Sequence, residues 1–336
     1  MSEFARAKHG WLLGVLLLLG VMPAYGQTPT FETIDLWPAD HWPQVVSGPE
    51  KVGQDGSASG SVTRVSRPRI EVYRAARPNG TAALIVGGGG YFRIQIGSAA
   101  RPMARWLASI GVTSAVLYYR LPADGWKPEA PFQDAQRAMR VMRSHAAQWN
   151  VDPQKIGILG SSAGANLSGI TATRWDHDFY PRIDAADELS SRPDFLGMLY
   201  PVVSMQPPLD KTRSARELST QADYRTAYSV QEHIRTDMPP VFLAQAVDDP
   251  IVDVGHSLLM YQAALKAKVP VELHEFESGG HSWGMGKPGT QPAQWPRLFA
   301  TWARMHGFMR DPSRPGAAIQ APPASAAESK DNDRSD

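Results

Sequence analysis

The sequence predicts an α/β protein with a mostly parallel central sheet and helices on both faces of that sheet. Across residues 69–310, apolar runs of strand length alternate with amphipathic stretches of helix length, which is typical of strands joined by helical connections. No internal repeat is evident, and 43% of the 336 residues are hydrophobic, as in an ordinary globular protein. We therefore expect one sheet domain.

Seven apolar runs are predicted to form the strands of this sheet. They cover residues 70–73, 82–86, 113–119, 156–159, 196–203, 241–246 and 271–276. The run at 82–86 ends at Gly87, and the run at 156–159 is followed at once by Gly160.

Helices are predicted at 103–110, 256–267 and 295–305, and others begin near Ala165 and at Pro131. Proline is favoured in the first turn of a helix. After Pro131, apolar residues recur at spacings of 4, 3, 4 and 3, namely Ala135, Met139, Met142, Ala146 and Trp149. This stripe is predicted to pack on the sheet, while Arg137, Arg140 and Ser144 face elsewhere.

The first 26 residues have the features of a secretory signal peptide. Arg6 and Lys8 precede an apolar run over residues 11–21, and Pro23, Ala24 and Gly26 follow with the spacing that signal peptidase cleaves. The run is shorter than a typical bilayer-spanning helix. If it is not cleaved, it would remain as an N-terminal anchor. We therefore expect residues 1–26 to be removed and the protein to be secreted or periplasmic.

The rest of the chain is predicted to consist of one folded domain over residues 27–311 and a disordered tail over 312–336. The tail is rich in Pro, Ala and Ser and has no apolar residue larger than Ile319, so it cannot bury enough surface to offset its ordering entropy. Residues 27–68 carry Pro, Gly and Ser with little periodicity. We expect them to wrap over the domain.

Charge and cysteine content exclude several kinds of chemistry. The chain has no cysteine, so a disulfide scaffold, a thiolate metal site and a cysteine nucleophile are excluded. Without residues 1–26, 32 basic residues balance 32 acidic ones. This balance favours neither a nucleic acid nor an anionic membrane as a partner.

Residues 160–164 match the pattern G-x-S-x-G, in which the serine is a candidate nucleophile. In this pattern the chain leaves a strand and enters a helix in one sharp turn, and glycines on either side leave room for the crowding. Here Gly160 follows a predicted strand and Gly164 precedes a predicted helix. Ser162 is therefore predicted to stand above the sheet as a nucleophile.

A serine hydroxyl needs a base, here a histidine, and the histidine needs an acid that orients it. With this motif the acid follows the serine in the chain, and the histidine follows the acid. The strand at 241–246 leads into Asp248 and Asp249, and the strand at 271–276 leads into His281. Asp249 is the preferred acid because Pro250 sets it at the turn; Asp248 and Asp253 remain alternatives. The other candidate bases, His256 and His274, lie in predicted elements and are expected to be structural or exposed.

Acyl transfer also needs hydrogen-bond donors for the oxyanion. Residues 87–90 are four glycines after the strand that is expected to carry those donors, so their N–H groups can approach a substrate oxygen. We assign the oxyanion hole to Gly89, Gly90 and the N–H of Ala163. The loop lacks the Lys and Ser/Thr that would complete a phosphate-binding Walker motif.

These motifs resemble the α/β-hydrolase superfamily, and within it the bacterial secreted esterases grouped with acetyl xylan esterases and feruloyl-esterase-like hydrolases. The resemblance runs from about residue 35 to 309. Further landmarks that carry it are residues 36–38, 88–91, 119–122, 134–138, 152–153, 200–205, 239–240, 248–250 and 279–281. The chain departs from the family at Gly87, at Ala165 and over residues 206–227, which puts the substrate in doubt.

The resemblance implies a serine esterase that needs no cofactor or metal and acts on short acyl groups, acetyl above all, attached to carbohydrate. Tyr91, Phe92, Trp126 and Trp283 are candidates for a surface on which a sugar stacks, although plain packing is the commoner role of each such residue. A general carboxylesterase and a catalytically silent binding protein remain alternatives. A metal-dependent deacetylase has no supporting ligand motif, and the oligomeric state stays open.

Overall fold

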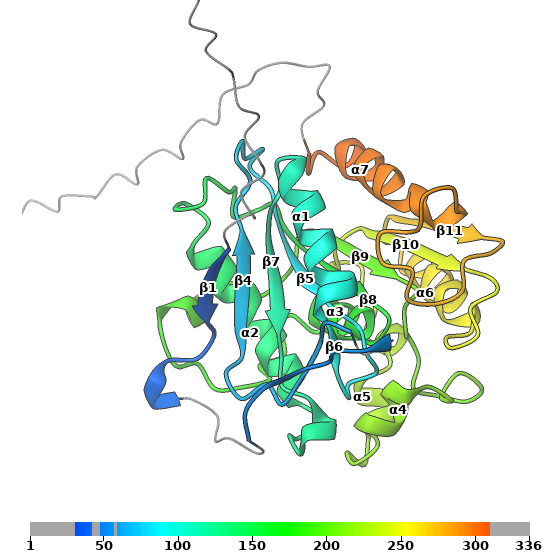
Figure 1. The fold of residues 1–336 in the computed structure, drawn as a ribbon, viewed down its shortest axis with the longest axis horizontal. Coiled ribbons are helices and arrows are strands. Elements are labelled where there is room, and N and C mark those ends of the chain that lie inside the picture. Colours follow the sequence, from blue (N-terminus) through cyan, green and yellow to red (C-terminus); the bar gives the residue numbers. More distant parts are fainter. Residues whose placement is uncertain (1–30, 42–47, 57–58, 310–336) are drawn as a thin grey trace, which may run out of the picture. The chain divides into compact units, whose positions relative to one another are not determined.

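The computed structural model describes residues 31–41, 48–56 and 59–309, and these residues have the predicted α/β architecture (Figure 1). Their main sheet has eight strands in the order β1-β4-β7-β5-β8-β9-β10-β11. The bounds are β1 Glu32–Asp35, β4 Arg69–Tyr73, β7 Thr113–Tyr118, β5 Ala82–Val86, β8 Ile156–Ser161, β9 Leu196–Leu199, β10 Val241–Ala246 and β11 Val271–Phe276. The pairs from β7 to β11 are parallel, whereas β1·β4 and β4·β7 are antiparallel. The prediction of a mostly parallel sheet is confirmed.

Helices cover both faces of the sheet. α1 (Arg101–Ser109) and α7 (Trp295–Met305) share one face, because the ring of Trp106 lies 5.2 Å from that of Trp295. α2 (Ala130–Ser144) packs on α3 (Ala163–Thr173) at the other face, and both lie behind the sheet in Figure 1. The remaining elements are α6 Gly255–Lys266, α4 Arg213–Leu218, α5 Tyr224–Ala227, β2 Lys51–Val52, β3 Ser61–Thr63 and β6 Ile94–Gln95, the last three forming a small second sheet.

Two predicted elements end several residues earlier in the structure than the sequence suggests. The strand predicted at 196–203 stops at Leu199, because Tyr200 has a φ of 38° and turns the chain. The helix that begins in the predicted place ends at Ser144, although Trp149 is still buried beyond it. Apolar patterning reports burial, and a turn can bury a side chain as well as a helix does.

The segment before residue 68 is more than the wrap that was predicted. Glu32–Asp35 joins the main sheet as the edge strand β1 and pairs with β4. The Nε1 of Trp37 then donates a 2.8 Å hydrogen bond to the buried carboxylate of Asp134, which also accepts from the guanidinium of Arg120 at 2.7 Å. Residues from three separate landmarks of the sequence thus meet in one buried network.

The predicted signal peptide (1–26) and tail (312–336) lie outside the described residues, so these boundaries stay predictions. Within the described ranges, no helix combines the length and the apolar character that crossing a membrane requires.

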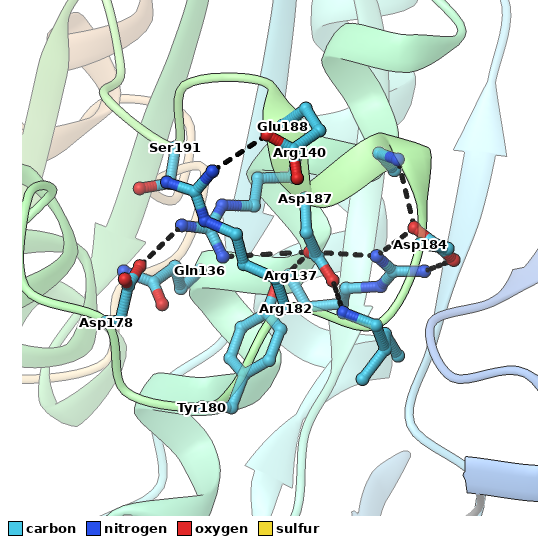
Figure 2. Close-up of polar contacts among 12 residues, drawn as sticks. Gln136, Arg137, Arg140, Asp178, Tyr180, Arg182, Asp184, Asp187, Glu188 and Ser191 are labelled. Carbon is cyan, nitrogen blue, oxygen red and sulfur yellow. Dashed lines mark hydrogen bonds and ion pairs between the residues drawn. The ribbon is translucent and has the colours of Figure 1, made fainter.

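The arginines of α2 that were predicted to face away from the sheet are buried under the loop of residues 174–194 (Figure 2). Arg137 pairs with Asp187 at 2.9 Å and also with Asp184, and Arg140 pairs with Asp178 at 3.0 Å. Asp187 accepts further hydrogen bonds from Tyr180 and from the N–H of Ile183. Burial raises the pKa of Asp187, but these donors outweigh burial and hold that pKa below its ordinary value.

We expect Asp187→Asn to lower the free energy of unfolding by about 3 kcal/mol at pH 7, because it removes the buried carboxylate from the charged network and leaves Arg137 with Asp184 as its remaining carboxylate partner. A carboxyl whose pKa is depressed by folding stabilises the protein above its unfolded pKa of about 3.9 and loses that contribution as the pH falls through the folded pKa. The deficit should therefore shrink below about pH 4. Urea unfolding at pH 7 and pH 3 measures both values.

Glu188→Gln is the matched control, since Glu188 and its partner Arg182 are both exposed. Such surface pairs contribute about 0–1 kcal/mol. A deficit for Asp187→Asn that is equal at the two pH values would show that the carboxylate charge is not what stabilises this loop.

Candidate active site

Ser162 lies in the sharp turn between β8 and α3, with φ 54° and ψ −122°, a backbone conformation that a non-glycine residue seldom adopts. The neighbouring glycines are required by close contacts. A Cβ on Gly160 would lie 2.2 Å from the carbonyl oxygen of Gly164, and one on Gly164 would lie 2.2 Å from that of Val86. The turn of the G-x-S-x-G pattern thus holds the serine in a strained position, as active sites often do.

The structure brings Ser162, His281 and Asp249 into one line of hydrogen bonds. The Oγ of Ser162 lies 2.9 Å from Nε2 of His281, whose Nδ1 lies 2.6 Å from Oδ2 of Asp249. The side chain of Asp249 is fully buried and that of His281 is 5% exposed. In this arrangement His281 can take a proton from the serine while Asp249 orients the ring and stabilises its charged form.

The geometry also distinguishes the three candidate acids. Asp249 uses its second oxygen to accept the N–H groups of Ile251 and Val252, at 2.9 and 3.0 Å. Asp248 does not reach the imidazole; its Oδ1 accepts the N–H groups of Gly279 and Gly280, each at 2.8 Å, and so holds the loop that carries His281.

The third candidate acid and the other two histidines have structural contacts. Asp253 accepts the N–H of Gly255 at 2.7 Å. His256 is buried, and its Nδ1 accepts the N–H of Val203 at 3.1 Å; burial lowers its pKa to about 4, so the ring is neutral. His274 lies in β11 and contacts Glu272 at 2.7 Å.

Backbone donors converge beside the serine. Among the described residues, the N–H groups of Gly89, Gly90 and Ala163 have no hydrogen-bond acceptor. Gly89 and Gly90 line the same pocket as Ser162, and Ala163 is the first residue of α3, where the helix dipole favours negative charge. These groups are therefore available to a developing oxyanion.

A pocket of about 130 Å³ opens at Ser162 and His281. This is smaller than the 300–1,000 Å³ of typical ligand pockets. Its other lining residues come from six segments: Gly88, Phe92, Arg93, Gln95, Ser98 and Ala99; Ser161; Tyr200 and Val202; Thr212, Arg213 and Ser214; Ile251 and Val252; and Ser282.

The aromatic residues proposed as a sugar platform need correction. Tyr91 is fully buried and donates a 2.8 Å hydrogen bond to Asn166, so no face of its ring is free to stack. Trp126 packs near Arg120, and Trp283 packs edge-on against Tyr200 at 4.5 Å; neither lines this pocket of the described chain. Phe92 alone of the four candidates lines it.

No cluster of three or more potential metal ligands occurs within residues 31–41, 48–56 and 59–309.

The chain belongs to the alpha/beta hydrolase fold family, whose model matches residues 84–285. The predicted fold and the resemblance to the acetyl xylan esterase group are thereby confirmed, since the relatives include esterases of this kind.

Several of the curated relatives are named as esterases or acetyl-hydrolases, and one is named as an endo-1,4-beta-xylanase. The chain is 29% identical over 227 residues to an acetylxylan esterase of Xylanibacter ruminicola, covering 66% of this chain and 44% of that protein. It is 27% identical over 248 residues to an acetyl-hydrolase of Streptomyces hygroscopicus, covering 70% of this chain and 78% of that protein. The chain spans less than half the length of the first two curated relatives it matches.

Solved structures agree with this assignment. A bifunctional acetyl ester-xyloside hydrolase from Caldicellulosiruptor lactoaceticus matches with a TM-score of 0.69 and 29% identity, over 85% of this chain and 100% of that one. A thermophilic esterase from Thermogutta terrifontis, with propionate bound, matches with a TM-score of 0.64 and 26% identity, over 73% of this chain and 92% of that one.

Proposed function

We propose that this protein is a serine esterase that removes short acyl groups, acetyl above all, from acylated carbohydrate. The observation that carries the proposal is the hydrogen-bonded line Ser162–His281–Asp249 at a small pocket next to unpaired backbone donors. The similarity to an acetylxylan esterase and to an acetyl ester-xyloside bifunctional hydrolase supports an acetyl group as the acyl group and a carbohydrate as the alcohol.

The reaction follows from the positions of these groups. Ser162 attacks the ester carbonyl while His281 accepts its proton, and the N–H groups of Gly89, Gly90 and Ala163 stabilise the oxyanion. His281 then protonates the leaving alcohol, and water hydrolyses the acyl-enzyme by the same steps in reverse. Asp249 keeps the imidazole in the tautomer that this cycle needs.

Acetate release from acetylated xylan, measured beside hydrolysis of 4-nitrophenyl acetate, tests the substrate class. We expect release from both. Hydrolysis of the nitrophenyl ester alone would leave a general carboxylesterase, and turnover of neither would favour a silent member of the fold.

The signal-like features of residues 1–26 lead us to propose that the protein is exported. Fractionation of cells that express the full chain or a chain without residues 2–26 tests this. Retention of both forms in the cytoplasm would refute export.

A further inference from the structure

Two arginines pack on one aromatic ring in the lining of the candidate active-site pocket. The guanidinium carbon of Arg213 lies 4.5 Å from the centre of the Phe92 ring, and that of Arg93 lies 4.9 Å from it. Arg93 is on the loop that carries Gly89 and Gly90, and Arg213 is the first residue of α4. Both charges are thus held near Ser162 by cation–π contacts.

These charges are not neutralised within the pocket. The lining residues include no aspartate or glutamate. Arg213 is paired with Glu217 through its Nε alone, so its two terminal nitrogens keep their donors. The guanidinium of Arg93 has no carboxylate or hydrogen-bond acceptor among the described residues, and its Nε is buried without a partner.

The concentration of positive charge is a local feature of the pocket. The whole chain carries 34 basic and 33 acidic residues, and most of its buried arginines, such as Arg137, are paired with carboxylates. A buried polar group without a partner costs free energy, so an unpaired guanidinium in a pocket indicates a ligand that supplies the acceptor.

We propose that Arg93, Arg213 and Phe92 form a subsite for a carboxylate carried by the ester substrate. The inference rests on the proposed esterase function and narrows its substrate class to acidic esters, such as acylated carbohydrates that contain a uronic acid. The planar guanidinium matches a carboxylate with two parallel hydrogen bonds, and the Phe92 ring offers an apolar face beside it.

The position of the subsite explains how it would act. Arg93 follows Gly89 by four residues, and its N–H donates to the carbonyl of Gly89 at 3.3 Å. An anion bound by Arg93 would therefore be held next to the loop to which we assign the oxyanion-stabilising N–H groups. Binding energy from the carboxylate would orient the ester carbonyl at Ser162.

The test compares kcat/KM for matched acidic and neutral esters. One arm places the carboxylate on the acyl group (4-nitrophenyl hydrogen succinate against 4-nitrophenyl butyrate), and the other places it on the alcohol (acetylated methyl glucuronoside against acetylated methyl glucoside). We expect the acidic ester of at least one arm to be preferred, and the arm that shows the preference identifies the carboxylate's source. Arg93→Gln and Arg213→Gln should each lower the acidic-to-neutral ratio by about tenfold, because a charge-assisted hydrogen bond is lost.

Arg105→Gln is the matched control, since Arg105 is exposed on α1 and does not line the pocket; its ratio should not change. A wild-type enzyme that hydrolyses neutral esters with no preference for either acidic one would overturn the subsite and leave the esterase intact. If no ester is turned over, titration calorimetry of Ser162→Ala with glucuronate and with glucose tests the carboxylate subsite independently of the esterase activity. Tighter binding of glucuronate that Arg93→Gln abolishes supports the subsite, and equal binding overturns it.

Discussion

Ser162→Ala is expected to lower kcat for 4-nitrophenyl acetate by about 10⁶-fold, the largest effect of any single substitution proposed for this chain. The substitution removes the oxygen that His281 contacts at 2.9 Å, so no acyl-enzyme can form. The backbone donors and the pocket remain, and a small rate above that of water should persist. Steady-state and single-turnover rates measure the loss.

The folded state of this variant should be unchanged, because alanine keeps the Cβ and the backbone conformation of residue 162 is set by its neighbours. A circular dichroism melt equal to that of the wild type is the control. Retention of more than about one hundredth of kcat would mean that another residue is the nucleophile.

Asp249→Asn is expected to lower kcat by about 10⁴-fold with little change in KM. The amide has nearly the same shape as the carboxylate, but it favours the wrong imidazole tautomer and cannot stabilise the charged ring. Since Asp249 is fully buried and contacts His281 at 2.6 Å, no water replaces the lost charge.

Asp248 provides the matched comparison in the adjacent position. Asp248→Asn keeps an oxygen that can accept from Gly279 and Gly280, so kcat should fall less than tenfold. Asp248→Ala removes both hydrogen bonds and loosens the loop that carries His281. Its kcat should therefore fall more than that of Asp248→Asn and less than that of Asp249→Asn. Equal losses for Asp248→Asn and Asp249→Asn would contradict the assigned roles.

Much of the fold could be predicted because its signals are local. The strands Val241–Ala246 and Val271–Phe276 are short apolar runs with definite ends, and the structure reproduces them. The strained turn at Ser162 was found because the G-x-S-x-G pattern lies within five consecutive residues, although the atom that leaves no room for a Cβ on Gly164 belongs to the distant Val86. Edge strand β1 was missed because an exposed four-residue strand carries no apolar pattern.

The binding side of the pocket could not be predicted, because it depends on residues far apart in sequence. Arg213 comes from a region that does not match the resembled family, and nothing local to it indicates that it meets Phe92. The same holds for Tyr91, a candidate for stacking on a sugar: Asn166, 75 residues away, binds its hydroxyl inside the core, and nothing local to Tyr91 indicates this contact.

Covalent labelling with a fluorophosphonate, read by intact mass and peptide mapping, tests the central claim most directly. The serine hydrolase account predicts one adduct per chain, on Ser162, formed by the wild type, formed far more slowly by His281→Gln, and absent from Ser162→Ala. Labelling at another residue, or a folded wild-type protein that forms no adduct while a known serine esterase does, would contradict it.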